Sequence, residues 1–401
     1  MIELRVLVSG ASIAGPAIAY WLGHCGCAVT VVEKASRLRL GGQAVDFKGD
    51  THRTVLQRMG VLDEVLARQT GGHDQTVIDA SGRRLAVIPG EFSGGEIEIA
   101  RGDLSEIIYR STEADCEYLF GDSIRSISQD ADAVRVEFDH AAPRTFDLVV
   151  GADGIHSNVR RLVFGPESDY VTFLGHYYAL ADVHVPGDGL MYNEPGRMVA
   201  VGGPKASAFF VFASPELRFD RYDTEQHKQI LRAAYAGGGW RTAELMERLD
   251  DAQELYLDSL SKAWIDRYAQ GRVILLGDAA YGNTLGGFGT GLAMVGAYVL
   301  AGELAAADGD HTAAFRRYEQ RMRPYAKIAK SGSAGAFLAP PTRAQMWTRN
   351  LTFRSRLLLR AMLKLTDAFA TRIDLPDYPM PAAVPRTDAP AAHQIPTGEQ
   401  P

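Results

Sequence analysis

The sequence has 401 residues, of which 46% are hydrophobic and 23% charged, with a formal net charge of −7 and a pI near 5.8. An acidic chain without clusters of Lys and Arg offers no electrostatic surface for nucleic acid or anionic lipid. Three cysteines without metal or disulfide spacing, and no long uncharged apolar segment, indicate a cytoplasmic protein with no metal site and no membrane span. The length predicts about two to three domains.

The first predicted elements are a buried strand, a glycine turn, a helix and a second buried strand, at residues 4–8, 10–15, 14–22 and 28–32. In the turn, GASIAG, Gly10 permits the sharp bend and Gly15 permits close packing of helix on strand, while Ser12 replaces the usual middle glycine. The helix N-terminus can bind a pyrophosphate, and Glu33 can accept ribose hydroxyls. The unit predicts a dinucleotide site with an unphosphorylated ribose. The alternative is a purely structural turn.

Residues 43–47 are predicted as a short strand, residues 51–67 as one amphipathic helix and residues 76–99 as a hairpin that turns at Ser81-Gly82. Gly41-Gly42 is either a hairpin turn or a place where backbone lies against a flat ring. Arg101 opens the next helix, where its charge opposes the helix dipole, so we expect it to face an anion or an acceptor. A solvated surface arginine is the alternative.

A second strand–glycine junction follows short strands in residues 117–146. Residues 148–150 form a buried strand that ends in GADG at 151–154, and Asp153 can accept hydrogen bonds from a loop or a ribose. Residues 171–213 predict a broad antiparallel sheet rich in aromatic residues. Its aromatic side chains form either a core layer or a wall for a flat ligand: Tyr177, Tyr178, Phe209, Phe210 and Phe212. Helical spacing returns at residues 224–249.

The third junction begins with a buried strand at residues 272–276 that runs into Gly277-Asp278. A glycine-rich loop and a long helix at residues 292–306 follow. Asp278 can bind a polyol hydroxyl, and the glycines ahead of the helix can approach the polarised edge of a ring. The alternative is a glycine-rich loop that serves only packing. The remaining chain is predicted as helices at 313–329 and 346–372, with a turn at Pro340-Pro341, and a proline-rich disordered tail at 376–401.

Taken together, the three junctions resemble the group A FAD-dependent aromatic hydroxylases, the p-hydroxybenzoate hydroxylase-like family. Within it, the chain is most similar to the branch of tetracycline- and rifampicin-inactivating monooxygenases and polyketide hydroxylases. The resemblance covers about residues 3–375 and implies an α/β fold: a Rossmann-type FAD-binding domain with an inserted antiparallel-sheet substrate domain and C-terminal helices. The implied boundaries are 1–73, 98–170 and 262–330 for the FAD-binding domain, 74–97 and 171–261 for the substrate domain, and 331–375 for the helices.

The resemblance also implies which residues contact FAD. They are Gly10, Ser12, Ile13, Ala14, Gly15, Glu33, Lys34, Gln43, Asp46, Arg101, Leu104, Asp153, Gly154, Gly277, Asp278, Gly287, Gly289 and Thr290. The substrate is expected against Tyr178, Phe210 and Phe212. The chain departs from the family at Tyr281, where a histidine is usual, and at Asn283, Thr284 and Leu285, where one or two prolines are usual.

The implied reaction is hydroxylation of a flat aromatic or polycyclic molecule: NADPH or NADH reduces FAD, O₂ adds at flavin C4a, and the hydroperoxide transfers its distal oxygen. It requires no metal, and spacing singles out none of the ten histidines as a base. The expected partners are the small-molecule substrate and O₂, in a monomer or a homodimer. The altered loop at 281–285 leaves a second hypothesis, an FAD-binding cyclase or auxiliary protein that does not oxygenate. A halogenase is disfavoured because its W-x-W-x-I-P segment is absent.

Overall fold

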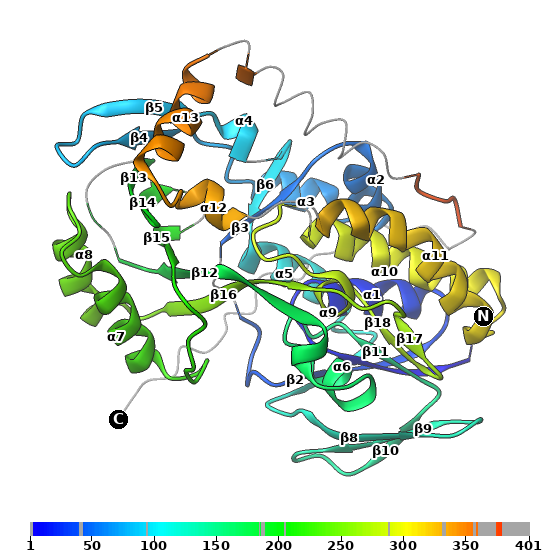
Figure 1. Ribbon diagram of the computed structural model, residues 1–401. Helices are drawn as coiled ribbons and strands as arrows, with labels where there is room; N and C mark the ends of the chain where they lie inside the picture. The colour runs from blue at the N-terminus through cyan, green and yellow to red at the C-terminus, as the bar shows by residue number, and fades with distance from the viewer. Residues whose placement is uncertain are drawn as a thin grey trace.

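A parallel sheet and a larger, mainly antiparallel sheet organise the computed structural model (Figure 1). The structure describes residues 3–39, 43–93, 95–183, 185, 189–203, 206–287, 289–330, 334–355, 358–359 and 374–378. The predicted turn at Gly41-Gly42 and most of the predicted tail lie outside these residues.

The first sheet contains the strands of all three glycine junctions. Its order is β17 (Ala269–Gln270), β18 (Val273–Leu275), β11 (Leu148–Gly151), β1 (Arg5–Ser9), β2 (Ala28–Glu33) and β7 (Glu117–Phe120). All neighbours pair in parallel except β17 and β18. The apolar runs of β1 and β11 are buried because helices and a further sheet cover both faces. The carboxyl ends of these strands therefore meet at one edge, where a doubly wound sheet binds its ligand.

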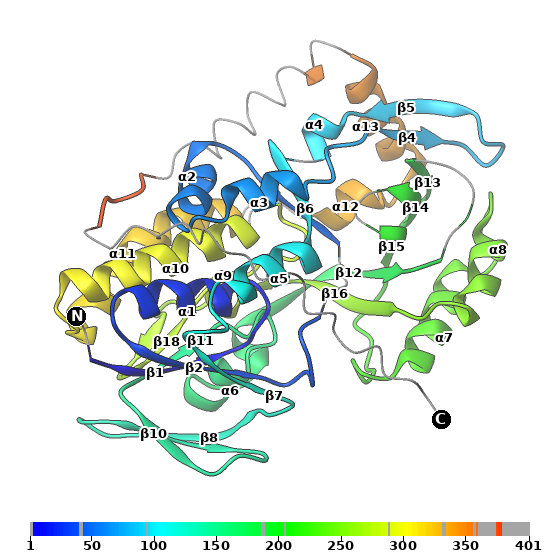
Figure 2. The ribbon, with the colours of Figure 1, turned by 180° about the vertical axis from the view of Figure 1, so that it is seen from behind.

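Helices α1 (Ala14–His24), α10 (Gly289–Ala306) and α11 (His311–Lys330) lie on one side of this sheet. A three-stranded sheet lies on the other side, made of β10 (Arg144–Phe146), β9 (Val134–Phe138) and β8 (Ile124–Gln129) (Figure 2). Within the described residues, α10 alone has the length and hydropathy of a membrane span, but 78% of it is buried inside the fold. A helix enclosed in this way is apolar all round because every face is packed.

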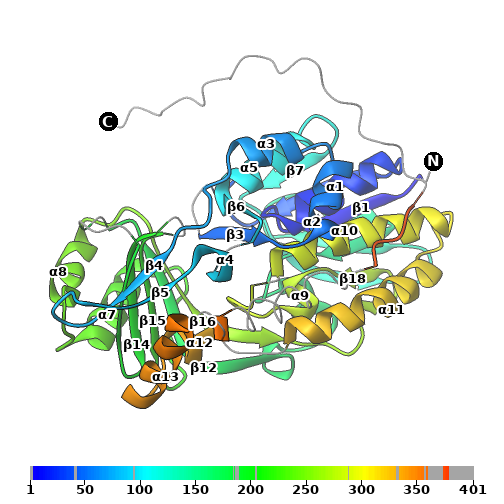
Figure 3. The same cartoon turned by 90° about the horizontal axis from the view of Figure 1, so that it is seen from above.

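The second sheet has the order β16 (Leu255–Ala263), β12 (Val171–Ala181), β15 (Ala206–Ala213), β14 (Arg197–Gly203), β13 (Leu190–Glu194), β4 (Gln75–Ile78) and β5 (Arg84–Ile88). It is antiparallel apart from the pair β4 and β13. Helices α7 (Thr224–Tyr235) and α8 (Thr242–Glu247) cover one face, and Figure 3 shows this sheet beside the helices of the parallel sheet. The strands β12 and β16 extend toward the parallel sheet, so the larger sheet borders its ligand-binding edge.

The remaining elements connect or flank the two sheets. They are β3 (Ala44–Phe47) and β6 (Ile97–Ala100), which pair with each other, α2 (Asp50–Arg58), α3 (Leu62–Ala67), α4 (Gly90–Ser93), α5 (Arg101–Arg110), α6 (Asn158–Val163), α9 (Asp278–Tyr281), α12 (Ala334–Leu338), α13 (Arg343–Arg354) and two 3₁₀ turns (Glu167–Asp169 and Arg248–Asp250). The predicted order of strands and helices is confirmed for the described residues, but the hairpin predicted at 76–99 ends at Ile88: α4 follows it, and β6 pairs with β3 instead. The mixed α/β architecture, a parallel sheet beside a mainly antiparallel one with helices at the C-terminal end, is thus the predicted one.

Three boundaries differ from the sequence-based expectation. Residues 51–67 form two helices because Gly60 adopts a positive φ of 74° between α2 and α3. The C-terminal helix α13 ends at Arg354, where Ser355 leaves the helical conformation, and residues 360–373 lie outside the described part. The start of the expected disordered tail is packed, since Tyr378 Oη donates to the buried Glu303 carboxylate over 2.7 Å.

Candidate active site

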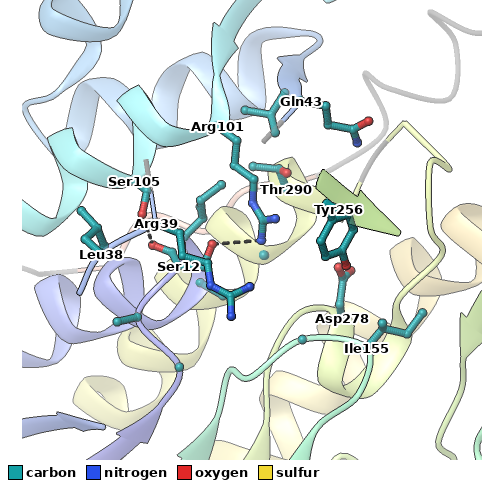
Figure 4. A pocket seen from close by; sticks show the side chains of 18 of the residues that line it. Ser12, Leu38, Arg39, Gln43, Arg101, Ser105, Ile155, Tyr256, Asp278 and Thr290 are labelled. Atoms are coloured by element: carbon teal, nitrogen blue, oxygen red, sulfur yellow. Dashed lines mark hydrogen bonds between the residues drawn. The ribbon is translucent and has the colours of Figure 1, made fainter. Parts of the chain in front are cut away.

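A continuous cleft of about 3960 Å³ runs along the carboxyl edge of the parallel sheet and onto the face of the larger sheet. This volume is several times that of a pocket for one small ligand, roughly 300 to 1,000 Å³. Figure 4 shows part of the lining, with side chains from the N-terminal turn, α5 and the third glycine junction directed into one space. The cleft is therefore large enough for an extended cofactor together with a substrate.

The glycine turn after β1 forms one end of the cleft. A Cβ atom on Gly10 would lie 2.6 Å from the Ala152 carbonyl oxygen, and one on Gly15 would lie 1.7 Å from the Gly10 carbonyl oxygen. Both glycines are thus required by close backbone approach. No side chain caps α1, so the N–H groups of its first turn are available to a phosphate. Gly15 itself packs behind the turn.

Glu33 ends β2 beside this turn. Its Oε2 accepts a hydrogen bond from the Ala11 N–H and its Oε1 one from the Ala35 N–H, each of 2.8 Å. A carboxylate offers about four acceptor positions, so hydroxyl groups of a ribose can still donate to it. The next residue, Lys34, holds its Nζ 4.4 Å from the centre of the Tyr222 ring.

Arg101 faces the turn as the helix-dipole argument predicts. Its Nη2 donates to the Ser12 hydroxyl over 3.0 Å, and the Ser105 hydroxyl donates to the Ser12 carbonyl over 2.9 Å (Figure 4). The first turn of α5 is thereby joined to the glycine turn, and the exposed guanidinium adds positive charge beside it.

Asp278 lies at the third junction, next to the N-terminus of α10. A Cβ on Gly289 would lie 3.1 Å from Asp278 Oδ1, which shows how closely the helix start approaches the carboxylate. Asp278 is exposed to the cleft. Desolvation by the surrounding protein atoms raises its pKa, while the charge of Arg101 opposes the shift. Among the described residues no hydrogen-bond donor of the protein reaches this carboxylate. Gln43, Asp46, Gly287 and Thr290 line the same space.

Asp153 has a different role, because its carboxylate is already occupied. It accepts hydrogen bonds from the Ser157 hydroxyl (2.5 Å), the Val159 N–H (3.0 Å) and the Ser9 hydroxyl (3.2 Å). Burial raises its pKa, and these donors oppose that shift. Asp153 thus ties the end of β1 to the start of α6, while Gly154 lines the cleft with its backbone.

The loop that departs from the family is attached to the larger sheet. The Thr284 N–H donates to the Ser261 carbonyl over 3.0 Å, and Ser261 N–H donates back to the Thr284 hydroxyl over 3.3 Å. Leu285 has a φ of 56°, a strained value for a branched side chain, beside the cleft. Tyr281 points away from the cleft, where its hydroxyl lies 3.2 Å from that of Tyr318.

Part of the wall formed by the larger sheet is apolar. Phe209, Met191 and Leu180 line the cleft together with Tyr178, and Phe92, Phe337 and Leu338 approach from α4 and α12. Phe210 and Phe212 do not line it, so these two substrate assignments are corrected. Successive strand residues face opposite sides, and both rings pack against Tyr235 of α7. Leu104 and Gly277, predicted as FAD contacts, are also packed behind the cleft surface.

Three titratable residues that the sequence did not single out lie side by side at the cleft. Tyr256 Oη donates to Asp258 Oδ2 over 2.8 Å, and His156 Nε2 lies 3.2 Å from both oxygens of Asp258. Burial opposes the charge of His156, but hydrogen bonds to Asp258 and Glu167 raise its pKa above the usual value. In the sequence, His156 could have been singled out because it lies two residues after Gly154 of the second glycine junction. Within the described residues no cluster of three or more His, Cys, Asp or Glu could hold a metal ion.

Comparison with known proteins agrees with this geometry. A family model described as FAD binding domain matches residues 3–331. A flavin-dependent monooxygenase from an unknown prokaryotic organism is 35% identical over 392 residues, which cover 93% of this chain and 99% of that protein. This chain belongs to the FAD-dependent monooxygenase family. The monooxygenase uses FAD as its cofactor, and NAD(P)H is the co-substrate typical of the family.

Further relatives of this monooxygenase support the assignment. The uncharacterized protein Rv1260 of Mycobacterium tuberculosis is 42% identical over 339 residues, which cover 80% of this chain and 90% of that protein. The crystal structure of tetracycline destructase Tet(55) matches with a TM-score of 0.79 and 32% identity, covering 94% of this chain and 100% of that chain. The predicted resemblance to group A hydroxylases is confirmed.

Proposed function

We propose that this monooxygenase hydroxylates a flat, largely apolar aromatic or polycyclic molecule. The observation that carries the proposal is the apolar wall of Phe209, Met191 and Leu180, which faces the glycine junctions across one cleft. An apolar, aromatic patch of this kind favours a flat ring system. The tetracycline destructase relative, named for a polycyclic antibiotic, supports the same class.

The residues of the cleft fit FAD at several points. The uncapped start of α1, with Ser12 and Arg101 beside it, would hold the pyrophosphate, and Glu33 the adenosine ribose. Asp278, which lacks a protein donor among the described residues, would accept hydroxyls of the ribityl chain. The N-terminus of α10 at Gly289 and Thr290 would meet the polar edge of the flavin ring. When bound, reduced FAD supplies the activation of O₂ for transfer of one oxygen atom.

The protein contributes orientation and exclusion of water. The wall of Phe209 and Met191 would hold the ring of the substrate against the flavin, and the attached loop at Thr284 and Leu285 would close the space between them. We further infer the domain boundaries stated above from the sequence, a cytoplasmic location, and a monomer or homodimer as the assembly.

The experiment uses purified protein loaded with FAD. We expect NADPH or NADH oxidation to increase on addition of a polycyclic phenol, with formation of a hydroxylated product. Bound FAD without substrate-stimulated oxidation of NAD(P)H would favour the non-oxygenating hypothesis instead.

A further inference from the structure

A buried arginine lies behind the part of the cleft wall that α12 forms. Arg349 of α13 is 8% exposed. Its Nη2 donates to Asn193 Oδ1 of β13 over 2.8 Å, and its Nη1 donates to the carbonyl oxygens of Phe337 over 3.0 Å and Leu338 over 3.3 Å. The guanidinium also donates to Asn350 Oδ1 over 3.0 Å. All of these acceptors are amide or peptide oxygens, so none of them carries a formal charge.

The positive charge of Arg349 has no acidic partner in the described part of the chain. No Asp or Glu there forms an ion pair with it, and burial alone lowers its pKa, to about 10. The side chain is therefore still protonated at neutral pH. Removal of a guanidinium from water is costly unless an opposite charge offsets it, so an unpaired buried cation is uncommon. The hydrogen bonds to the end of α12 offset part of this cost.

The charge lies close to the space for the substrate. Phe337 lines the cleft, and the guanidinium carbon of Arg349 lies 5.9 Å from the centre of its ring. Phe92 of α4 and Phe353 of α13 pack against Phe337, with ring centres 5.5 and 6.0 Å away. Figures 1 and 2 show α4 and α13 side by side next to β4 and β5. Because these rings exclude water, they screen the charge much less than solvent would.

The larger sheet places no opposite charge against this part of the cleft. Its strands β13 and β15 contribute the uncharged lining residues Met191, Ser207 and Phe209. Glu194, at the end of β13, is paired with Arg197 over 3.0 Å. A positive potential from Arg349 therefore extends into the apolar part of the cleft.

We propose that Arg349 makes the cleft select flat aromatic substrates that carry a negative charge. The proposal names the substrate class more closely and rests on the proposed function. Arg349 does not touch the substrate but determines specificity across Phe337, through its charge. Two unit charges about 10 Å apart, at an effective dielectric constant of about 20, change an affinity roughly 10-fold. An uncharged molecule of the same shape gains nothing from this interaction.

The test measures the binding of two probes to the FAD-loaded full-length protein. One is 6-hydroxynaphthalene-2-sulfonate, which is anionic, and the other is the corresponding 2-sulfonamide, which has the same ring and nearly the same shape without the charge. The change in flavin absorbance on binding gives both dissociation constants without turnover. We expect the wild type to bind the sulfonate roughly 10-fold more tightly than the sulfonamide.

Two variants remove the charge in different ways. Arg349→Met deletes the guanidinium, whereas Asn193→Asp keeps it and places a carboxylate at the acceptor of its 2.8 Å hydrogen bond. Both should bring the ratio of the two dissociation constants close to one. Arg349→Lys retains the charge without the planar fork and should keep most of the ratio. Arg343→Met, at an exposed position of the same helix, is the matched control and should leave the ratio unchanged.

The ratio separates a role of the charge from a purely structural role. A wild type that binds both probes equally, or binds neither, would overturn the proposal. Equal weakening of both probes in Arg349→Met would show that Arg349 only holds α12 in place, and would overturn it as well. If Arg349→Met does not fold, an unchanged ratio in Asn193→Asp has the same consequence. A protein that shows the expected ratio but hydroxylates neither probe would overturn the proposed function and leave the charge preference in place.

Discussion

The guanidinium of Arg101 donates to the hydroxyl of Ser12 over 3.0 Å, so the first turn of α5 is joined to the turn that begins the dinucleotide site. Arg101 is exposed, and its contribution to the fold is small. We therefore predict that Arg101→Ala weakens FAD binding roughly 10- to 100-fold, as loss of a charge-assisted contact to phosphate would, with little change in Tm. Fluorescence titration of the apoprotein with FAD measures this. Arg83→Ala, on the exposed β4–β5 hairpin, is the control, and equal FAD affinities in all three proteins would refute the assignment.

Replacement of Asp278 should change both the pH dependence of protein stability and the affinity for FAD. Its pKa is raised in the folded protein by desolvation, so between its unfolded value of 3.8 and the raised value the folded state binds more protons and stability falls as pH rises. Asp278→Asn should therefore raise the Tm of the apoprotein at pH 7 and leave it unchanged below pH 3.8. The same variant should bind FAD roughly 10-fold more weakly, because a charge-assisted hydrogen bond is lost. Thermal unfolding at two pH values and FAD titration give both results, and a lower Tm at pH 7 would contradict this account.

Alanine substitutions at two glycines of α1 should have opposite effects on the stability of the protein. An alanine Cβ at Gly15 would lie 1.7 Å from the Gly10 carbonyl oxygen, whereas nothing lies within 4 Å of a Cβ at Gly23. We predict that Gly15→Ala destabilises the protein by about 1–3 kcal/mol or more through overpacking, and that Gly23→Ala stabilises it by about 0.5–1 kcal/mol through helix propensity. Urea unfolding compares the variants. Equal stabilities would show that the turn is looser than described.

Substitution of two neighbouring phenylalanines of β15 should distinguish an effect on substrate binding from an effect on stability. Phe209 lines the cleft, and Phe210 is fully buried against Tyr235. Phe209→Ala should raise KM for a polycyclic phenol about 10-fold or more, since roughly 1.4 kcal/mol of apolar contact corresponds to a factor of ten. Phe210→Ala should cost about 3–5 kcal/mol of stability. If Phe210→Ala alone altered KM, the two faces of the sheet would have been assigned the wrong way round.

The nucleotide-binding unit was predictable because its signals are local. Gly10, Gly15 and Glu33 occur at fixed offsets around one strand and one helix, and the steric contacts of the two glycines match the reasons given for them. The faces of β15 were not predictable, because Phe209, Phe210, Val211 and Phe212 are all apolar and show no alternation from which a buried face could be read.

Longer-range contacts account for the other differences. His156 and Asp258 are 102 residues apart, so no spacing could pair them before the fold was known. Tyr378 lies in a proline-rich segment that reads as disordered, but it packs against Gly302 of α10, a contact that depends on the missing side chain of that glycine. The break at Gly60 was the one difference that local sequence could have indicated, since a glycine near a helix end is a common stop signal.

The central claim is tested most directly by following labelled oxygen. FAD-loaded protein is supplied with NADPH or NADH, a polycyclic phenol and isotopically labelled O₂, and the product is examined by mass spectrometry. We predict one labelled oxygen atom in the product and dependence on both FAD and the nicotinamide. Consumption of NAD(P)H by FAD-loaded protein without labelled product, or a product that carries oxygen from water, would contradict it.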